Sequence, residues 1–386
     1  MKVIIAGGGI GGLTAAIALQ RRNIEVEVFE RSPELREVGA GISLWPNAMK
    51  ALRKLGLGDA LDPLSHANSE SFLRTSTGAI LSRTPAGAWE QRFGSGMVVF
   101  HRAELLHTLA QAVGPSALHL DHACEGFESD PDGVTVRFTN GSTVRGDALI
   151  GADGLHSAVR TALGHRTPPR YSGYTAWRGI PTFPHDKLMP GETWGSGKRF
   201  GIVPVQGGRV YWYATANAPE SGSASLPQSP LELFRNWHDP VEALIRATPE
   251  SYILRNPIYD RDPIPEWGRG RITLLGDAAH PMTPNLGQGA CQAIEDALEL
   301  AAALTRPSLS VEQSLRAYES RRMNRTKSVV LTSRRIGNLG QLESAPLCFL
   351  RNLALRLTPV SATLNNLAPI VGYEGHLADR GGEGQG

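Results

Sequence analysis

The amino-terminal part of the chain alternates short apolar runs with helical spacing. Lys2 to Ala6 is an apolar run that glycines end, as is typical of a buried parallel strand. Helical spacing follows, with Leu13 and Ile17 on one face, and a second apolar run covers 24–29 and ends on Glu30. This order predicts a strand–helix–strand unit.

Two later runs, 148–150 and 272–275, have the same buried-strand character and are followed by Gly-Ala-Asp-Gly and by Gly-Asp. Between them, 171–217 contains aromatic and β-branched runs that Gly and Pro divide, which predicts an antiparallel sheet. Alternate side chains of its last run, 209–215, would face opposite sides of that sheet. We therefore expect an α/β fold in which a parallel sheet is interleaved with a smaller antiparallel one.

Composition excludes several classes of protein. The chain has 386 residues, 41 % of them apolar and 20 % charged, which is ordinary for a globular protein. A net charge of +2 gives no sign of a nucleic-acid partner. The basic stretch 316–335 could be a docking patch, but a solvated helix face is the simpler interpretation.

Cysteine usage and hydropathy indicate the compartment. Three cysteines are far apart and show no metal-ligand spacing, which argues for reducing surroundings, and the histidines show none either. The first strand begins at residue 2, and no apolar run approaches the roughly 20 residues of a membrane span. We expect a cytoplasmic protein with no membrane span and no metal.

A glycine-rich turn joins the first strand to the first helix. Gly7, Gly9 and Gly12 satisfy the pattern GxGxxG, and Glu30 ends the next strand 18 residues after Gly12. Gly7 permits the tight turn, Gly9 lets the backbone approach a pyrophosphate, and Gly12 lets the helix pack closely on the strand. The acid suits a ribose 2′-hydroxyl. The turn predicts a dinucleotide site but does not distinguish FAD from NAD.

Further segments resemble motifs of the class A, single-component FAD-dependent monooxygenases, in that family's order, over about residues 1–335. They are GADGLHSAVR at 151–160, GDAAHP at 276–281 running on to PNLGQG at 284–289, ELREVGAGI at 34–42 and HRAEL at 101–105. Within the family the pattern is most similar to urate hydroxylases, salicylate hydroxylases and zeaxanthin epoxidases.

The resemblance implies a Rossmann-like FAD-binding domain interleaved with a substrate domain. The FAD-binding domain would comprise 1–70, 100–168 and 266–345, and the substrate domain 71–99 and 169–265. A C-terminal helical segment with a disordered tail would follow at 346–386.

The resemblance also implies which residues contact FAD. Asp277 would hold the ribityl chain, and the helix beginning at 286–289 would point its amides at the flavin. Arg36 could instead be a surface residue, Arg102 a helix-start ion pair and Asp153 part of a turn. The implied contacts are Gly7, Gly9, Gly12, Glu30, Arg36, Gly41, Arg102, Asp153, Asp277, Pro284, Gly287 and Gly289.

The activity that the resemblance implies is a monooxygenation. NAD(P)H would reduce the flavin, O₂ would form a C4a-hydroperoxide, and its distal oxygen would hydroxylate or epoxidise a small, flat, electron-rich aromatic, heteroaromatic or polycyclic substrate. The protein would be a monomer or a homodimer. Two other functions stay open: an oxygen-independent FAD reductase or dehydrogenase, and a non-catalytic binding protein such as the Rab GDP-dissociation inhibitors.

The substrate pocket is expected around Arg199 and Arg178 on the antiparallel sheet and around Pro284 and Asn285. Either arginine could anchor an anion or a carbonyl, or be a surface charge. Urate hydroxylases tend to carry Asp where this chain has Asn285, whereas Arg199 matches a urate-contacting arginine, so urate stays open as a substrate. His280 could act as a base, but a structural role within its motif is the simpler interpretation.

Overall fold

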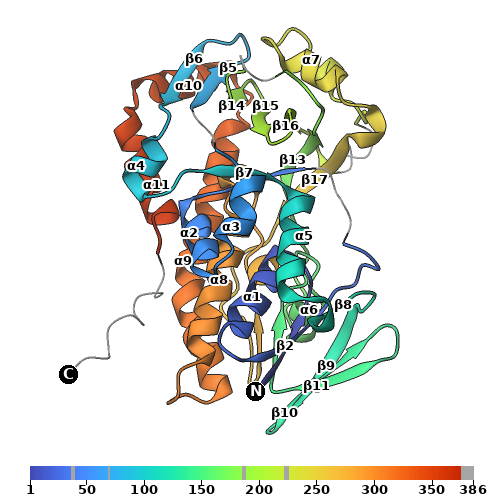
Figure 1. Ribbon diagram of the computed structural model, residues 1–386. Helices are drawn as coiled ribbons and strands as arrows, with labels where there is room; N and C mark the ends of the chain where they lie inside the picture. The colour runs from blue at the N-terminus through green and yellow to red at the C-terminus, as the bar shows by residue number, and fades with distance from the viewer. Residues whose placement is uncertain (36–39, 68–69, 185–187, 221–225, 375–386) are drawn as a thin grey trace, which may run out of the picture.

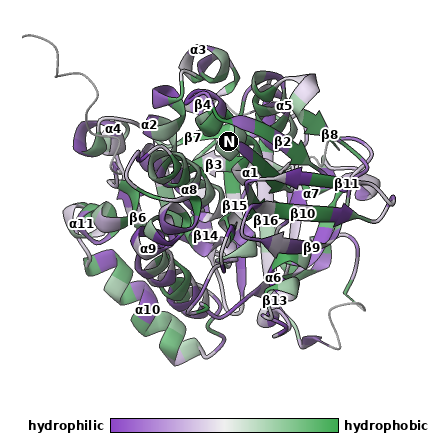
Figure 2. Ribbon diagram, turned by 90° about the horizontal axis from the view of Figure 1, so that it is seen from below, coloured by the Kyte–Doolittle hydropathy of each residue, from purple (hydrophilic) through white to green (hydrophobic). Residues whose placement is uncertain are grey.

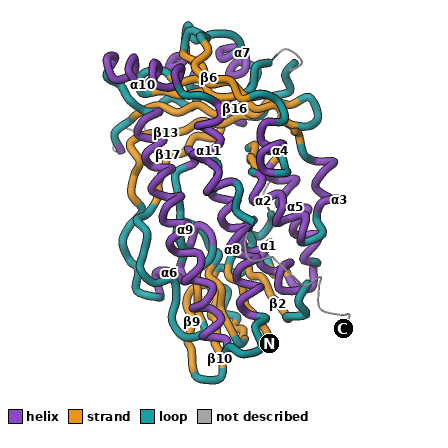
Figure 3. The backbone as a smooth tube through the Cα atoms, turned by 90° about the vertical axis from the view of Figure 1, so that its left-hand side faces the viewer, coloured by secondary structure: helices purple, strands orange, loops and turns teal. Residues whose placement is uncertain are grey.

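The computed structural model describes residues 1–35, 40–67, 70–184, 188–220 and 226–374. Arg36 and the expected disordered tail at 381–386 lie outside the described residues. The molecule is elongated, with a parallel sheet at one end and a larger sheet at the other (Figures 1 and 3).

Five parallel strands form the predicted α/β core, in the order β18-β12-β1-β2-β8. Their apolar runs are buried because helices cover them, as the sequence pattern predicts. The fold-class prediction is confirmed. The strands are β1 (Lys2–Ala6), β2 (Glu25–Phe29), β8 (Leu118–His119), β12 (Ala148–Gly151) and β18 (Ile272–Leu274).

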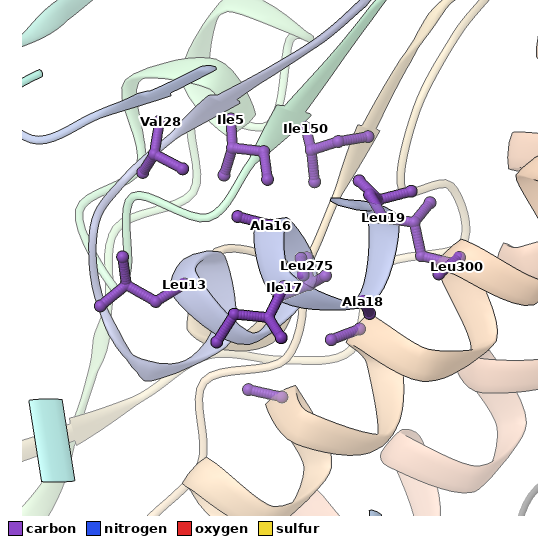
Figure 4. Packing of buried hydrophobic residues seen from close by; sticks show 14 of the residues in the cluster. Ile5, Leu13, Ala16, Ile17, Ala18, Leu19, Val28, Ile150, Leu275 and Leu300 are labelled. Carbon is purple, nitrogen blue, oxygen red and sulfur yellow. The ribbon is translucent and has the colours of Figure 1, made fainter. Parts of the chain in front are cut away.

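Helix α1 (Ile10–Gln20) packs on this sheet and contacts α5 (Arg102–Val113) and α8 (Gly289–Leu304). Figure 4 shows Ile5 and Ile150, from neighbouring strands, facing α1. A small antiparallel sheet, comprising β9 (Cys124–Asp130), β10 (Gly133–Phe138) and β11 (Thr143–Gly146), lies at the same end of the molecule (Figure 1).

A seven-stranded sheet forms the other end, in the order β17-β13-β16-β15-β14-β5-β6. Within the predicted segment 171–217 all neighbouring strands pair antiparallel, as expected. Of the strands added from elsewhere, β17 and β6 also pair antiparallel, whereas β5 pairs parallel with β14. The strands are β5 (Ser71–Thr75), β6 (Ile80–Thr84), β13 (Arg170–Gly179), β14 (Gly191–Trp194), β15 (Lys198–Val205), β16 (Arg209–Asn217) and β17 (Leu254–Asp260).

The two faces of this sheet are buried in separate clusters, as its alternating pattern predicts. Trp177 and Trp212 pack with Phe234 on the outer face. Tyr211 and Val205 pack on the inner face, which is turned toward the parallel sheet. A small sheet of β3 (Gly41–Leu44), β4 (His66–Ala67) and β7 (Val98–His101) contacts this inner side through β7 and β15.

Helix α9 (Val311–Gly340) connects the two ends of the molecule (Figure 3). It begins at a capping box, in which the Ser310 side chain accepts from the Gln313 amide and the Gln313 side chain accepts from the Ser310 amide. The remaining helices are α2 (Pro46–Lys54), α3 (Gly58–Leu61), α4 (Ala88–Phe93), α6 (Ala158–Ala162), α7 (Val241–Arg246), α10 (Ala345–Leu357) and α11 (Val360–Val371). Of the described helices, none is long and apolar enough to cross a membrane.

The interpretation of 316–335 as a solvated helix face is wrong for part of α9. Arg322 is fully buried, with its guanidinium 2.6 Å from Asp296 and 2.5 Å from Glu295. Charge counting could not predict this because the two acids are neighbours on another helix, α8, and lie 27 and 26 residues from Arg322 in sequence.

Candidate active site

The glycine-rich turn is shaped by close backbone contacts. Gly7 has a φ of +115°, and a Cβ there would lie 2.3 Å from the carbonyl oxygen of Ala152. A Cβ at Gly12 would lie 2.0 Å from the oxygen of Gly7. A Cβ at Gly9, which caps α1, meets no described atom within 4 Å. The turn is therefore closed on the protein side and open where phosphates could approach the helix terminus.

Glu30, at the end of β2, supports this turn. Its Oε2 accepts a hydrogen bond of 2.7 Å from the Gly8 amide, and its Oε1 accepts one of 3.0 Å from the Ser32 amide. Each carboxylate oxygen has a second lone pair. Glu30 can therefore hold the turn and still accept ribose hydroxyls.

Asp277 lies in a short turn, η6 (Gly276–Ala278), directly after β18. Its side chain is exposed, yet desolvation by the surrounding protein raises the pKa of its carboxyl, while His280 and Arg102 oppose that rise. A Cβ on Gly289 would lie 3.9 Å from its Oδ1. Asp277 and the amino terminus of α8 thus border the same space.

The start of α8 differs from the sequence expectation. Pro284–Leu286 forms a separate 3₁₀ turn, η7, and Gly287 ends it with a φ of +61°. The helix begins at Gly289, not at Leu286. Gly287 is required there because left-handed backbone is strained for other residues.

Asp153 and Arg160 organise the loop after β12. Asp153 Oδ2 accepts hydrogen bonds from the amides of Ala158 (2.7 Å) and Val159 (3.2 Å), which favours the turn interpretation, and burial raises the pKa of its carboxyl. Its buried Oδ1 has no partner among the described residues. Buried Arg160 donates to the carbonyls of Ala278 and Ala279, both at 3.0 Å, and so ties this loop to the Asp277 turn.

His280 is part of a buried polar network. Its Nε2 lies 2.6 Å from Asp296 Oδ2, which also accepts from the Gly276 amide at 3.0 Å. Burial alone would raise the pKa of Asp296, but His280 and Arg322 lower it to about 2. The geometry favours the structural interpretation of His280.

The inner face of the seven-stranded sheet lies against β3 on the other side of the site from the parallel strands. A Cβ on Gly41 would lie 2.5 Å from the ring of Tyr211, so glycine allows the close approach of β3 to β16. Burial raises the pKa of Tyr211, and the charges of Arg178 and Arg102 oppose that rise. Arg102 begins α5, and its amide donates to the Ala40 carbonyl at 2.9 Å. Arg178 and Arg102 therefore lie near the same tyrosine.

Arg199 is the centre of a buried polar cluster on this inner face and is only 2 % exposed. It donates to Asn285 Oδ1 (2.5 Å), Gln341 Oε1 (2.9 Å) and Glu192 Oε1 (3.3 Å), and it lies 5.7 Å from the ring centre of Tyr174. Sequence reasoning identified Arg199 and Asn285, which the structure brings together. It missed Gln341, Glu192 and Tyr174.

The neighbours of Asn285 fix the orientation of its amide. Its Nδ2 donates to Thr283 Oγ1 (2.8 Å) and to the Ser333 carbonyl (3.0 Å), which can only accept. Its Oδ1 consequently faces Arg199 and accepts from the Tyr174 hydroxyl at 3.2 Å. An Asp at this position would direct a carboxylate oxygen at the Ser333 carbonyl, so the fold itself favours Asn. Pro284 precedes it in the same 3₁₀ turn.

The arrangement offers contacts for an elongated dinucleotide and, next to it, for a flat ligand. The glycine turn, Glu30 and Asp277 lie at the carboxyl ends of the parallel strands, where open α/β sheets bind ligands. The inner face of the large sheet contributes Tyr211 and Arg199 on the opposite side. In the described part of the chain, no group of three or more His, Cys, Asp or Glu could hold a metal ion.

Comparison with known proteins gives consistent matches. A family model described as an FAD binding domain matches residues 1–333. The chain is 45 % identical to an aurachin C monooxygenase/isomerase of Stigmatella aurantiaca (92 % of this chain, 94 % of the relative) and 37 % identical to a 3-amino-4-hydroxybenzoate 2-monooxygenase of Streptomyces cremeus (93 % and 92 %). Its structure resembles that of Klebsiella pneumoniae HpxO complexed with FAD and uric acid, with a TM-score of 0.90, 33 % identity and 98 % coverage of both chains.

Proposed function

The chain belongs to the FAD-binding domain family as a flavin-dependent monooxygenase, and we propose that it uses NAD(P)H and O₂ to hydroxylate or epoxidise a small, flat, electron-rich aromatic or heteroaromatic compound. One observation carries the proposal. Arg199 of the large sheet donates to Asn285 Oδ1 at 2.5 Å, in the turn that precedes α8, and a Cβ on Gly289 at the start of α8 would lie 3.9 Å from Asp277 Oδ1, so the large sheet and the dinucleotide edge meet at the start of α8.

The residues at this edge fit FAD. The open side of Gly9 would receive the pyrophosphate, Glu30 the adenosine ribose, and Asp277 the ribityl hydroxyls. The amino terminus of α8, with Gly287 and Gly289, would stabilise negative charge on the isoalloxazine. FAD supplies the redox chemistry with O₂ when it is bound.

The protein's own residues would bind and orient the substrate. A guanidinium has five N–H donors, and described residues engage at least three of those of Arg199, so at most two remain for a ligand. A carboxylate or a ring carbonyl suits this planar donor. Asn285 and Tyr174 would hold Arg199 in place. Arg178, whose charge lies near Tyr211, would be a second cation close to the substrate.

The same surface would exclude water from the reaction. Ile180, Val203 and Leu254 pack with Tyr211 on the inner face of the large sheet and supply an apolar surface for a flat ring. Asn285 is neutral and its amide is fully engaged, so we propose that it positions the site and does not accept a proton from the substrate.

A substrate screen that follows NAD(P)H oxidation and O₂ uptake together tests this proposal. The FAD-loaded protein should consume both in equal amounts with a flat aromatic acid or carbonyl compound. Flavin reduction by NAD(P)H with product formation under argon would instead identify an oxygen-independent reductase. A protein that binds no flavin and consumes neither would be a binding protein.

A further inference from the structure

Helix α10 lies at the periphery of the molecule (Figure 2), and several of its large apolar side chains are exposed. Its large apolar side chains are between 43 % and 73 % exposed. The surface of a monomer seldom gathers so many large apolar groups on one helix, and such faces usually mark interaction sites. The residues are Leu347, Phe349, Leu350, Leu353 and Leu357.

The opposite face of α10 is fixed to the body of the protein. Arg351 is buried there and donates to the carbonyls of Gly195 (3.2 Å), Leu339 (3.3 Å) and Gly340 (3.4 Å). Its guanidinium also lies 5.3 Å from the ring centre of Trp194. The orientation of α10 is therefore set, and its apolar face cannot turn inward.

The spacing of this face is that of a helix–helix seam. Pro346, Leu350, Leu353 and Leu357 follow one another at intervals of four, three and four residues, as at the a and d positions of a heptad. We propose that this face packs against the same face of a second copy of the chain, with the two α10 helices antiparallel.

An antiparallel pair is self-complementary in size. A two-fold axis between positions 351 and 352 would set Leu350 against Leu353 of the second copy and the smaller Pro346 against Leu357. A parallel pair would instead set each seam residue against its own copy, with Pro346 beside Pro346 and Leu357 beside Leu357, which matches large and small side chains less well.

Charge favours a second copy over a membrane surface. The sequence from 345 to 371, which covers α10 and α11, contains no Asp, Glu or Lys, and its only charged residues are Arg351, turned inward, and Arg356. A helix that lies on a membrane normally presents several Lys or Arg to the lipid headgroups. Two almost uncharged faces can pack against each other without such basic side chains.

The area points to a dimer of moderate strength. Covering the exposed parts of the five side chains would remove on the order of 400 Å² of apolar surface per protomer. A standard interface covers about 800 Å² per partner, and the adjacent Leu339 and Ile80, which are also exposed, would add to the contact. We expect a concentration-dependent dimer with a dissociation constant on the order of micromolar.

The proposed interface lies outside the active site, but α10 contacts Gly340, which packs against Arg199. The Gly340 carbonyl accepts from Arg351, and a Cβ at Gly340 would lie 2.8 Å from Arg199 Cδ. Variants on the outer face of α10 should therefore retain FAD, which provides a check that they are folded.

Sedimentation of the FAD-loaded full chain over a concentration series tests the proposal. The wild type should approach twice the chain mass of 41.5 kDa. Leu353→Glu and Leu350→Lys should each raise the dimer dissociation constant at least about a hundredfold, because each buries an unpaired charge. Tyr252→Glu, at an exposed large side chain outside α10, is the control and should not change it.

The double variant Leu350→Lys/Leu353→Glu tests the register. In the antiparallel pair each Lys faces a Glu of the second copy, so dimerisation should partly return, whereas a parallel pair would place Lys against Lys. A wild type that stays monomeric at all concentrations would overturn the proposal, as would a dimer that both single variants leave intact. Monomers that bind vesicles of anionic phospholipid through α10 would assign the face to a membrane and overturn it equally.

Discussion

Replacing Arg199 by Ala tests the proposed role of the buried polar cluster. The substitution removes three hydrogen bonds, but two of the acceptors keep a partner: Gln341 Oε1 accepts from Thr215 Oγ1 at 3.0 Å, and Asn285 Oδ1 accepts from Tyr174. The third acceptor, on Glu192, is partly exposed and can bind water. The free energy of unfolding should therefore fall by only about 2–3 kcal/mol, and the variant should fold.

The effect on the reaction should be larger than the effect on folding. A charge-assisted hydrogen bond to the substrate contributes about 1.5–3 kcal/mol, so KM should rise roughly tenfold to over a hundredfold. When the substrate is misplaced, NAD(P)H and O₂ should be consumed to give hydrogen peroxide instead of product. The ratio of product to NAD(P)H consumed should therefore also fall.

The assay measures KM, this ratio and FAD occupancy together, on the substrate that the screen identifies. Arg178→Ala is the matched variant from the same inner face and should affect KM less, because Arg178 lies outside the polar cluster. If Arg199→Ala retained normal KM and normal coupling, the orienting residue would have to be Arg178. Loss of FAD from Arg199→Ala would show that Arg199 supports the fold instead.

Three other predictions follow from the cofactor edge. Asp277→Ala should raise the dissociation constant for FAD roughly tenfold to over a hundredfold, with Asp277→Asn in between, as measured by flavin fluorescence; an unchanged affinity would contradict the proposed contact. Gly9→Ala should keep the thermal stability of the wild type but bind FAD less tightly, because a Cβ at Gly9 meets no described atom. Gly12→Ala should lower the free energy of unfolding by about 1–3 kcal/mol, because a Cβ at Gly12 meets the backbone of Gly7. Equal melting temperatures of the two variants would refute this. Because the pKa of Asp296 is lowered to about 2, its ionised form stabilises the fold above about pH 4 and that contribution, about 2 kcal/mol, is lost as pH falls through about 2. Asp296→Asn should accordingly lose less stability than the wild type between about pH 5 and about pH 2 in urea titrations, and parallel losses would contradict the assignment.

Local patterns were sufficient for much of the fold. The apolar run of β1, the glycine turn and Glu30 predict the strand–helix–strand unit because each depends on residues close together in the sequence. Alternation along β16 likewise predicts its two faces, since the period of a strand is two. The parallel pairing of β14 with β5 escaped prediction because it joins segments more than a hundred residues apart.

The polar cluster shows why site residues were found only in part. Arg199 and Asn285 belong to recognisable segments, but Gln341 is 142 residues from Arg199 and lies at the end of a helix without any motif. Arg322 was misinterpreted for the same reason, since its acidic partners come from another helix. Contacts made by tertiary packing leave no local period in the sequence.

Reaction under ¹⁸O₂ tests the proposed monooxygenation most directly. With FAD, NAD(P)H and the substrate from the screen, mass spectrometry should find one labelled oxygen atom in each product molecule, and none when the label is supplied only in water. A product whose new oxygen came from water, or one formed equally well without O₂, would contradict the proposed function.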